Sequence, residues 1–202
     1  MMKILWLLGT LATVYGVEFE IYNYDGGDVW IGIQGSDGSE NLKNGGFILG
    51  SGQSVSIVAS NNWRGKFWGR TWCDDSSGRC LTGDCGKLEC NGASGEAPVT
   101  IAEINLLTSS NEDTYKVSLS NGFNTLASVE PVRGVGDCQK AKCDYHINND
   151  CPDSLKVDTE HGIIACRVSS DEEQYFRDRC GDAYFSKEYK CKASKYIVTI
   201  GG

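Results

Sequence analysis

The chain is poor in proline, and it has no apolar run long enough to cross a membrane. A membrane helix needs about twenty consecutive apolar residues, whereas the most apolar stretch of this sequence, residues 4–14, is about half that length. Three prolines against 25 glycines indicate a chain with many turns rather than a disordered one. We therefore expect a turn-rich protein without a membrane span.

Common catalytic motifs are absent as well. The sequence contains no GxSxG nucleophile elbow, no HExxH zinc motif and no GxxxxGK[ST] phosphate loop. Each of these motifs places a nucleophile, a zinc ion or a phosphate in a defined local structure, so their absence argues against those enzyme classes. No N-x-[ST] sequence occurs, and N-glycosylation is not expected.

The first sixteen residues have the pattern of a secretory signal peptide. Lys3 precedes the apolar stretch, and Val14 and Gly16 stand where signal peptidase accepts small side chains. Cleavage after Gly16 would start the mature chain at Val17. We therefore expect a secreted, extracellular protein.

The chain is acidic, with a formal charge of −8 that becomes −9 when Lys3 is removed with the signal. A negative surface repels phosphate backbones and anionic lipids, so neither nucleic acid nor membrane is expected as a partner. A net charge of this size is expected to keep the protein soluble in an extracellular fluid.

All ten cysteines lie between Cys73 and Cys191. An even number in an exported chain predicts five disulfides and leaves no thiol to act as a nucleophile. A zinc site is the weaker alternative, because His146 and His161 have no metal-ligand spacing with the cysteines. We expect no metal and no cofactor.

Alternating polar and apolar residues predict an all-β protein. Expected strands, bounded by turn residues, cover residues 17–24, 28–35, 54–59, 66–72, 99–107, 115–120 and 195–200. Many short strands at this spacing predict an antiparallel sandwich.

The alternation fades between residues 138 and 191, where six of the ten cysteines lie. Ser170, followed by three acidic residues, resembles a capping box that opens a helix through about Arg179. The expected organisation is therefore a signal peptide (1–16), the main sandwich (17–137), a disulfide-rich loop-and-helix subdomain (138–191) and a returning C-terminal strand (192–202).

Several sequence blocks, taken in order, resemble the thaumatin-like protein family. They are residues 19–23 (FEIYN), 65–73 (GKFWGRTWC), 82–86 (TGDCG), 122–124 (GFN) and 180–184 (CGDAY). The resemblance covers essentially residues 17–200 and implies a flattened antiparallel β-sandwich with a short disulfide-rich subdomain.

The resemblance also implies a disulfide pattern. The chain is similar to the small, ten-cysteine members, because the sites of the first and last cysteines of the larger members, near Tyr24 and at the C-terminus, are not cysteine. The family neighbour of Cys166 is also replaced, by Ile163. The implied pairs are Cys73–Cys80, Cys85–Cys90, Cys138–Cys191, Cys143–Cys180 and Cys151–Cys166.

Function in the family is located in a cleft lined by one arginine and four acids. The matching positions here are Lys66, Glu103, Lys116, Asn121 and Asp182, a set with no net charge instead of −3. The resemblance does not place two further acids, Asp74 and Asp75.

Hydrolysis of a β-1,3-glucan needs two carboxyl groups on either side of the scissile bond. The family proposal pairs the equivalents of Glu103 and Asn121, and asparagine cannot act as a base. Asp182 could replace it if it faces Glu103. The alternative for Glu103 is a carboxylate that is solvated, or paired with Lys66 or Lys116.

Binding requires only an aromatic platform and a few polar groups. In an unbroken strand, Lys66, Trp68, Arg70 and Trp72 share one side, unless Gly69 carries a bulge. We expect Trp72 to be a sugar platform, with core packing beside Cys73 as the alternative. Three further residues are interpreted more simply: Asp84 as a turn residue that caps backbone amides, and Tyr184 and Tyr189 as additional cleft aromatics.

The expected function is defence against fungi or other microbes by a monomeric, non-enzymatic binder of cell-wall β-glucan. One alternative is a weak endo-β-1,3-glucanase that uses Glu103 and Asp182. The other is an inhibitor of a foreign glycosidase that acts through surface loops.

Overall fold

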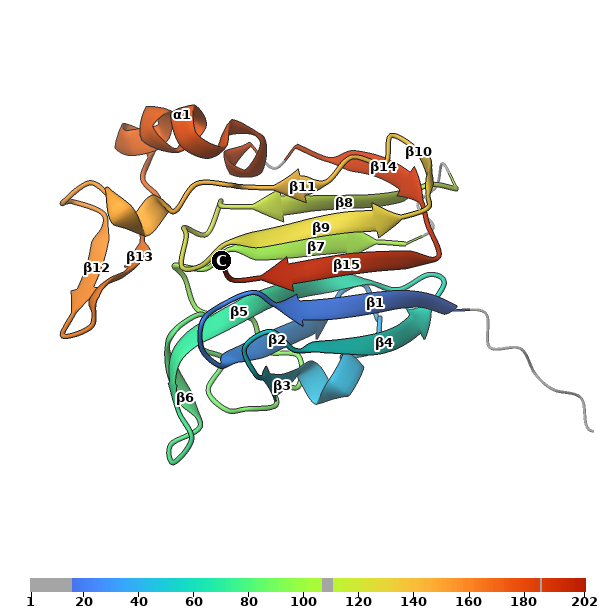
Figure 1. The fold of residues 1–202 in the computed structure, drawn as a ribbon, viewed down its shortest axis with the longest axis horizontal. Coiled ribbons are helices and arrows are strands. Elements are labelled where there is room, and N and C mark those ends of the chain that lie inside the picture. The colour runs from blue at the N-terminus through green and yellow to red at the C-terminus, as the bar shows by residue number, and fades with distance from the viewer. Residues whose placement is uncertain (1–15, 107–110, 186) are drawn as a thin grey trace, which may run out of the picture.

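Two packed β-sheets form the body of the protein (Figure 1). The computed structural model describes residues 16–106, 111–185 and 187–202. Sheet A has the strand order β11-β9-β15-β1-β4, and sheet B has the order β10-β14-β8-β7-β5-β2-β3, with β6 paired to β5. The fold is all-β, as expected, and antiparallel apart from the parallel pair β1–β15. The expected signal peptide lies outside the described residues, except for Gly16, which begins β1.

The strands have the following bounds. Sheet A contains β1 (Gly16–Asn23), β4 (Ser54–Ser60), β9 (Ala127–Val132), β11 (Ala141–Lys142) and β15 (Lys195–Ile200). Sheet B contains β2 (Val29–Gly35), β3 (Gly46–Leu49), β5 (Arg64–Asp74), β6 (Arg79–Thr82), β7 (Ile101–Asn105), β8 (Asp113–Ser118), β10 (Val135–Gly136) and β14 (Tyr189–Lys192).

The core lies between the two sheets and follows the alternation of the sequence. Phe19 and Ile21 of β1 are fully buried there because every second residue of a strand points to the same face. Phe67 of β5 meets Phe19 edge to face, with ring centroids 5.2 Å apart. In β1 the apolar side is therefore the side that joins the sheets.

The strand β9 was not predicted from the sequence. It contains Pro131 and the exposed Glu130, which obscure its alternation, and it lies between β11 and β15. Proline is tolerated in a strand where its missing N–H is not needed by the ladder. In the register of β9 with β15, Pro131 lies opposite Tyr196. Pairing with β15 therefore identifies β9 as a strand more clearly than its own sequence does.

The outer face of sheet B is partly covered by the segment 83–99, which we call the covering loop. Trp68 of β5 is fully buried beneath it and donates from Nε1 to the Gly83 carbonyl over 2.8 Å. A Cβ on Gly32 would lie 2.1 Å from Trp68 Cε2, and one on Gly95 would lie 2.5 Å from Trp68 Nε1. Only glycine lets β2 and the covering loop enclose this indole.

Residues 138–191 are only partly a separate subdomain, because their two ends are strands of the sandwich. β11 pairs with β9, and β14 pairs with β8. Between them lie the 3-10 turns η2 (Ile147–Asn149) and η3 (Ser170–Glu172), the hairpin β12 (Lys156–Thr159) and β13 (Gly162–Cys166), and the helix α1 (Glu173–Tyr184). The hairpin forms a sheet of its own and projects from the sandwich (Figure 1).

The expected helix is present, but its start differs from the prediction. Ser169, not Ser170, accepts a hydrogen bond from the Asp171 amide, and η3 precedes α1. The helical segment runs to Tyr184 with Phe176, Cys180 and Ala183 buried, but it is kinked at Cys180 (φ −142°, ψ 50°), which is bonded to Cys143. The regular part of the helix therefore ends near Arg179, as expected, and a short helical turn follows the kink.

The structure contains the five disulfides that the family resemblance implies, and no described cysteine is free. They are Cys73–Cys80, Cys85–Cys90, Cys138–Cys191, Cys143–Cys180 and Cys151–Cys166. Where larger relatives would join first and last cysteines, hydrogen bonds serve instead: the Tyr24 amide donates to the Ile200 carbonyl, and the Gly201 amide donates to the Leu126 carbonyl, each over 2.8 Å.

We expect Gly32→Ala to destabilise the protein by about 1–3 kcal/mol, because the added methyl overpacks against Trp68. Urea unfolding with the disulfides intact measures the change. Gly26→Ala is the matched control, since a Cβ there meets nothing within 4 Å. Equal stability of the two variants would contradict the tight enclosure of Trp68.

Candidate functional site

Four polar residues lie side by side on the outer face of sheet B. The strand register places Gln34 opposite Lys66, Lys66 opposite Glu103, and Glu103 opposite Lys116, across β2, β5, β7 and β8. We call this set the polar row. The expected cleft residues Lys66, Glu103 and Lys116 therefore do come together, and Gln34 joins them.

Glu103 is flanked by positive charge on both sides. Lys116 Nζ lies 3.3 Å from Glu103 Oε2, and about a third of the Glu103 side chain is exposed. Lys66 Nζ lies 3.3 Å from the Ser94 Oγ of the covering loop, and that hydroxyl donates to Gln34 Oε1 over 2.8 Å. Of the alternatives for Glu103, the structure has the ion pair with Lys116.

The other two expected cleft positions lie apart from the polar row. Asn121 lines a hollow of about 270 Å³ with Pro98, Arg167 and Val168. In the part of the chain that the structure describes, no hydrogen bond or ion pair joins Asn121 to the polar row. Its side chain is an amide, so it cannot supply the second carboxyl group that hydrolysis needs beside Glu103.

Asp182, on α1, is occupied by its own neighbours. Its Oδ2 lies 3.3 Å from Lys187 Nζ and accepts a hydrogen bond from the Tyr189 hydroxyl over 3.2 Å. Tyr189 is buried, and Tyr184 is stacked on Phe176 with centroids 5.5 Å apart. Neither tyrosine is an open sugar platform.

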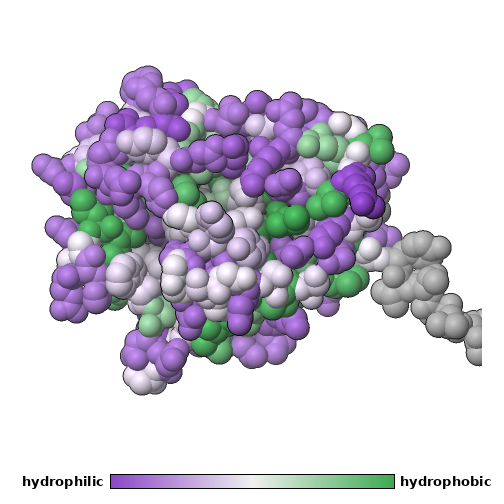
Figure 2. Space-filling model, viewed as in Figure 1, coloured by the Kyte–Doolittle hydropathy of each residue, from purple (hydrophilic) through white to green (hydrophobic). Residues whose placement is uncertain are grey.

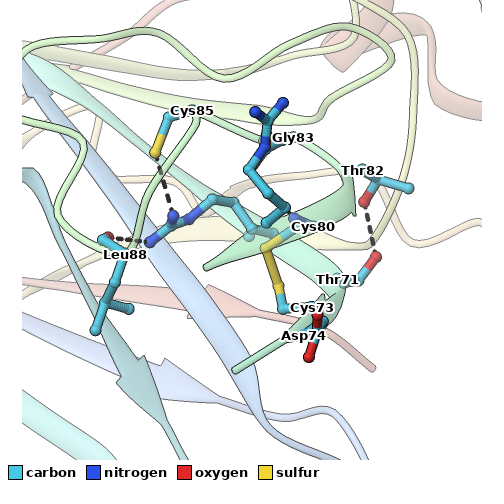
Figure 3. Close-up of a disulfide and its surroundings, with 12 residues drawn as sticks. Thr71, Cys73, Asp74, Cys80, Thr82, Gly83, Cys85 and Leu88 are labelled. Atoms are coloured by element: carbon cyan, nitrogen blue, oxygen red, sulfur yellow. Dashed lines mark hydrogen bonds and ion pairs between the residues drawn. A yellow bond between two sulfur atoms is a disulfide. The ribbon is translucent and has the colours of Figure 1, made fainter. Parts of the chain in front are cut away.

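Arg70 was expected in the cleft, and this was wrong, because the residue is fully buried beneath the covering loop. Its Nη2 donates to the carbonyls of Ile31 and Leu88, and its Nη1 donates to the carbonyl of Lys87. Figure 3 shows Leu88 and Cys85 beside this guanidinium. Burial lowers the pKa of Arg70 to about 10, so the group stays charged at neutral pH. Its hydrogen bonds hold the covering loop against β2.

Trp72 does not share a face with the polar row either. The β2–β5 register is unbroken through Gly69, and the alternation ends instead at Trp72, whose φ is +56°. Six residues of strand separate it from Lys66 by about 20 Å. The indole is 48% exposed, which rules out the core-packing alternative, and it stacks on His161 at 4.4 Å and 7°.

The remaining acids on the β5–β6 hairpin have local roles or none. Asp74 and Asp75 are exposed, and Asp74 Oδ1 accepts from the Ser76 amide over 3.0 Å. Asp84 Oδ1 accepts from the Cys80 amide over 3.1 Å, as expected for a turn residue, and its Oδ2 pairs with Arg79.

Neither a metal site nor a membrane span is found among the described residues. No cluster of three or more histidine, cysteine, aspartate or glutamate side chains occurs there. None of the described helices has the length and apolar character to traverse a bilayer. Figure 2 shows that the face over sheet A is mostly hydrophilic, with only scattered apolar areas.

The chain belongs to the thaumatin family, whose model matches residues 23–201. It is 34% identical to pathogenesis-related protein 5 of Arabidopsis thaliana, covering 93% of this chain and 91% of that protein. It is 35% identical to a Prunus avium protein named glucan endo-1,3-beta-glucosidase, with 79% and 73% covered. The solved structure of a thaumatin-like xylanase inhibitor matches with a TM-score of 0.55 and 24% identity, covering 91% and 97%. The last likeness shows the shared fold alone.

We expect Arg70→Lys to destabilise the protein by about 2–4 kcal/mol, because one ammonium cannot replace the planar fork that serves three buried carbonyls. Hydrogen exchange should also accelerate in residues 85–92. The control is Arg79→Lys, on the same hairpin but with a side chain 57% exposed. Unchanged exchange in the loop would contradict the pinning role.

Proposed function

We propose that the protein is a secreted defence protein that binds β-glucan of microbial cell walls at the polar row without cleaving it. The five disulfides fit an oxidising, extracellular compartment, in line with the proposed signal peptide. Antifungal action would follow from occupation of the wall polysaccharide. The protein acts as a monomer in this proposal.

The pairing of Glu103 is the observation that carries the proposal. A glycosidase needs one carboxyl that reaches the glycosidic oxygen and a second one about 5–10 Å away. Here Lys116 lies against Glu103 Oε2, and Lys187 and Tyr189 occupy Asp182 Oδ2. Each carboxylate therefore has one oxygen engaged by a lysine of this chain.

The same arrangement suits binding. An amide, two ammonium groups and a carboxylate stand on four neighbouring strands, which are about 4.8 Å apart, and the row is about 14 Å long. Sugar hydroxyls both donate and accept hydrogen bonds, so a mixed row of donors and acceptors matches a neutral polysaccharide.

Two relatives support the biological setting and the ligand class. The Arabidopsis thaliana relative is named as pathogenesis-related, which supports a role in defence. The Prunus avium relative is named for action on β-1,3-glucan, which supports this polymer as the ligand.

We expect the double variant Lys66→Ala/Lys116→Ala to sediment with insoluble β-1,3-glucan at least tenfold more weakly than the unmodified protein. It removes both ammonium donors of the row. Lys140→Ala/Lys142→Ala is the matched control, since these lysines are also ion-paired at the surface but lie on the side of sheet A. The control should bind within about twofold of the unmodified protein.

Soluble sugar is assayed in the same tubes. Binding without release of sugar is the expected result. Release that disappears in Glu103→Gln would replace the proposal with the weak endo-β-1,3-glucanase that uses Glu103 and Asp182.

Inhibition of a foreign glycosidase is the second candidate function. The observation in its favour is that the hairpins β5–β6 and β12–β13 project from the sandwich (Figure 1). Inhibition of a microbial glycosidase that is lost on shortening the β12–β13 hairpin, together with no sedimentation on glucan, would favour this function over the first.

A further inference from the structure

A hollow of about 390 Å³ lies at the end of the sandwich, apart from the polar row. Its walls come from three segments far apart in sequence: the β1–β2 turn with Asp25 and Asp28, the end of β5 with Trp72, and β13 with Ile163 and Ile164. The volume is within the range of small-molecule sites, about 300–1,000 Å³. We call this hollow the Trp72 pocket.

The aromatic wall of the pocket is held in place. Trp72 has a left-handed backbone, with φ of +56°, which is costly for a bulky side chain and is found mostly where a structure requires it. His161 stacks on one face of the indole, with ring centroids 4.4 Å apart. The ring is thus oriented by the hairpin β12–β13 while almost half of its surface remains in contact with solvent.

The floor of the pocket is rigid. Asn148 donates from Nδ2 to the carbonyls of Asn124 and Ile164, over 3.0 and 3.2 Å. Asn124 in turn donates to the Gly69 carbonyl and to Thr82 Oγ1, each over 2.8 Å. These bonds tie η2, β13 and β5 together beneath the hollow.

Two carboxylates at the rim are unpaired. Neither the Asp25 nor the Asp28 side chain has a hydrogen-bond or ion-pair partner among the described residues. A carboxylate only accepts hydrogen bonds, and hydroxyl groups are its natural donors. Two negative charges at one rim also disfavour an anionic ligand.

Two lining residues, Trp72 and Ile163, are brought together by the fold. They come from β5 and β13, more than 90 residues apart, and meet at one hollow. The pocket is therefore formed by tertiary packing and not by one local segment.

We propose that the Trp72 pocket is a second carbohydrate site, which takes one neutral hexose unit at the end of a glucan chain. Trp72 packs against the apolar face of the sugar ring, and Asp25 and Asp28 accept hydrogen bonds from its hydroxyls. The choice of a glucan as the source of the hexose rests on the proposed function. The pocket itself does not depend on the polar row.

Fluorescence quenching by acrylamide tests the contact directly, with laminarihexaose, a β-1,3-linked glucose hexamer, as the probe. Trp30, Trp63 and Trp68 are at most 4% exposed, so the difference between the unmodified protein and Trp72→Phe isolates the signal of Trp72. We expect the hexamer to protect this signal from the quencher. Absence of protection at saturating hexamer overturns the proposal.

Calorimetric titration of variants tests the residues. With the titration fitted to two sites, Trp72→Gly should weaken binding at the Trp72 pocket at least tenfold and Asp28→Asn about fivefold, whereas binding at the polar row should be unchanged. Trp72→Gly also relieves the left-handed backbone strain, so it should fold at least as well as the unmodified protein, and weaker binding is then not a folding defect. Leu81→Ala, which alters an exposed apolar side chain of the same hairpin, should bind within twofold.

The two proposed sites fail separately. Loss of one binding step in Trp72→Gly, with that step retained in Lys66→Ala/Lys116→Ala, supports the Trp72 pocket even if the polar row does not bind glucan. Full hexamer binding in both Trp72→Gly and Asp28→Asn overturns the pocket and leaves the proposal for the polar row intact.

Discussion

A single buried guanidinium organises the outer face of sheet B. Arg70 donates to carbonyls of β2 and of the covering loop, and so fixes the Cys85–Cys90 loop over Trp68. Backbone carbonyls accept its hydrogen bonds, and the charge of the buried Asp84 also favours the charged guanidinium. Truncating the Arg70 side chain would leave several buried polar groups unpaired. Trp68 and Arg70, which this loop covers, stand between Lys66 and Trp72 along β5, and the polar row and the Trp72 pocket are separate surfaces.

The chemistry of the polar row follows from its charge balance. A cleft with four acids would hold carboxylates close together, whereas here Glu103 lies between two lysines on neighbouring strands. Opposite charges directly across a sheet stabilise each other modestly and occupy each other's hydrogen-bonding groups. On this face Glu103 is therefore engaged by Lys116, which is why we propose that the polar row holds hydroxyl groups rather than carries out acid and base chemistry.

Some of this was predictable from the sequence, and the reasons are local. Alternation located the strands that bury one face, such as β1 and β15, and the family resemblance named Lys66, Glu103 and Lys116, which the register of β5, β7 and β8 places side by side. Arg70 and Trp72 were misplaced because strand parity says which side a residue takes, but not what covers that side. The covering loop buries Arg70. The left-handed backbone at Trp72 takes its side chain out of the alternation, and nothing in the sequence links Trp72 with His161. β9, which contains Pro131, can be recognised as a strand only from its pairing with neighbouring strands.

The central claim is that one small sandwich offers two separate surfaces to a neutral polysaccharide. Titration of ¹⁵N-labelled protein with laminarihexaose, followed by two-dimensional NMR, tests it most directly, because each backbone amide and the Trp72 indole report individually. The account predicts two groups of shifted signals that saturate independently, one around Lys66, Glu103 and Lys116 and one around Asp28, Trp72 and Ile163. Unshifted signals in either group would contradict it.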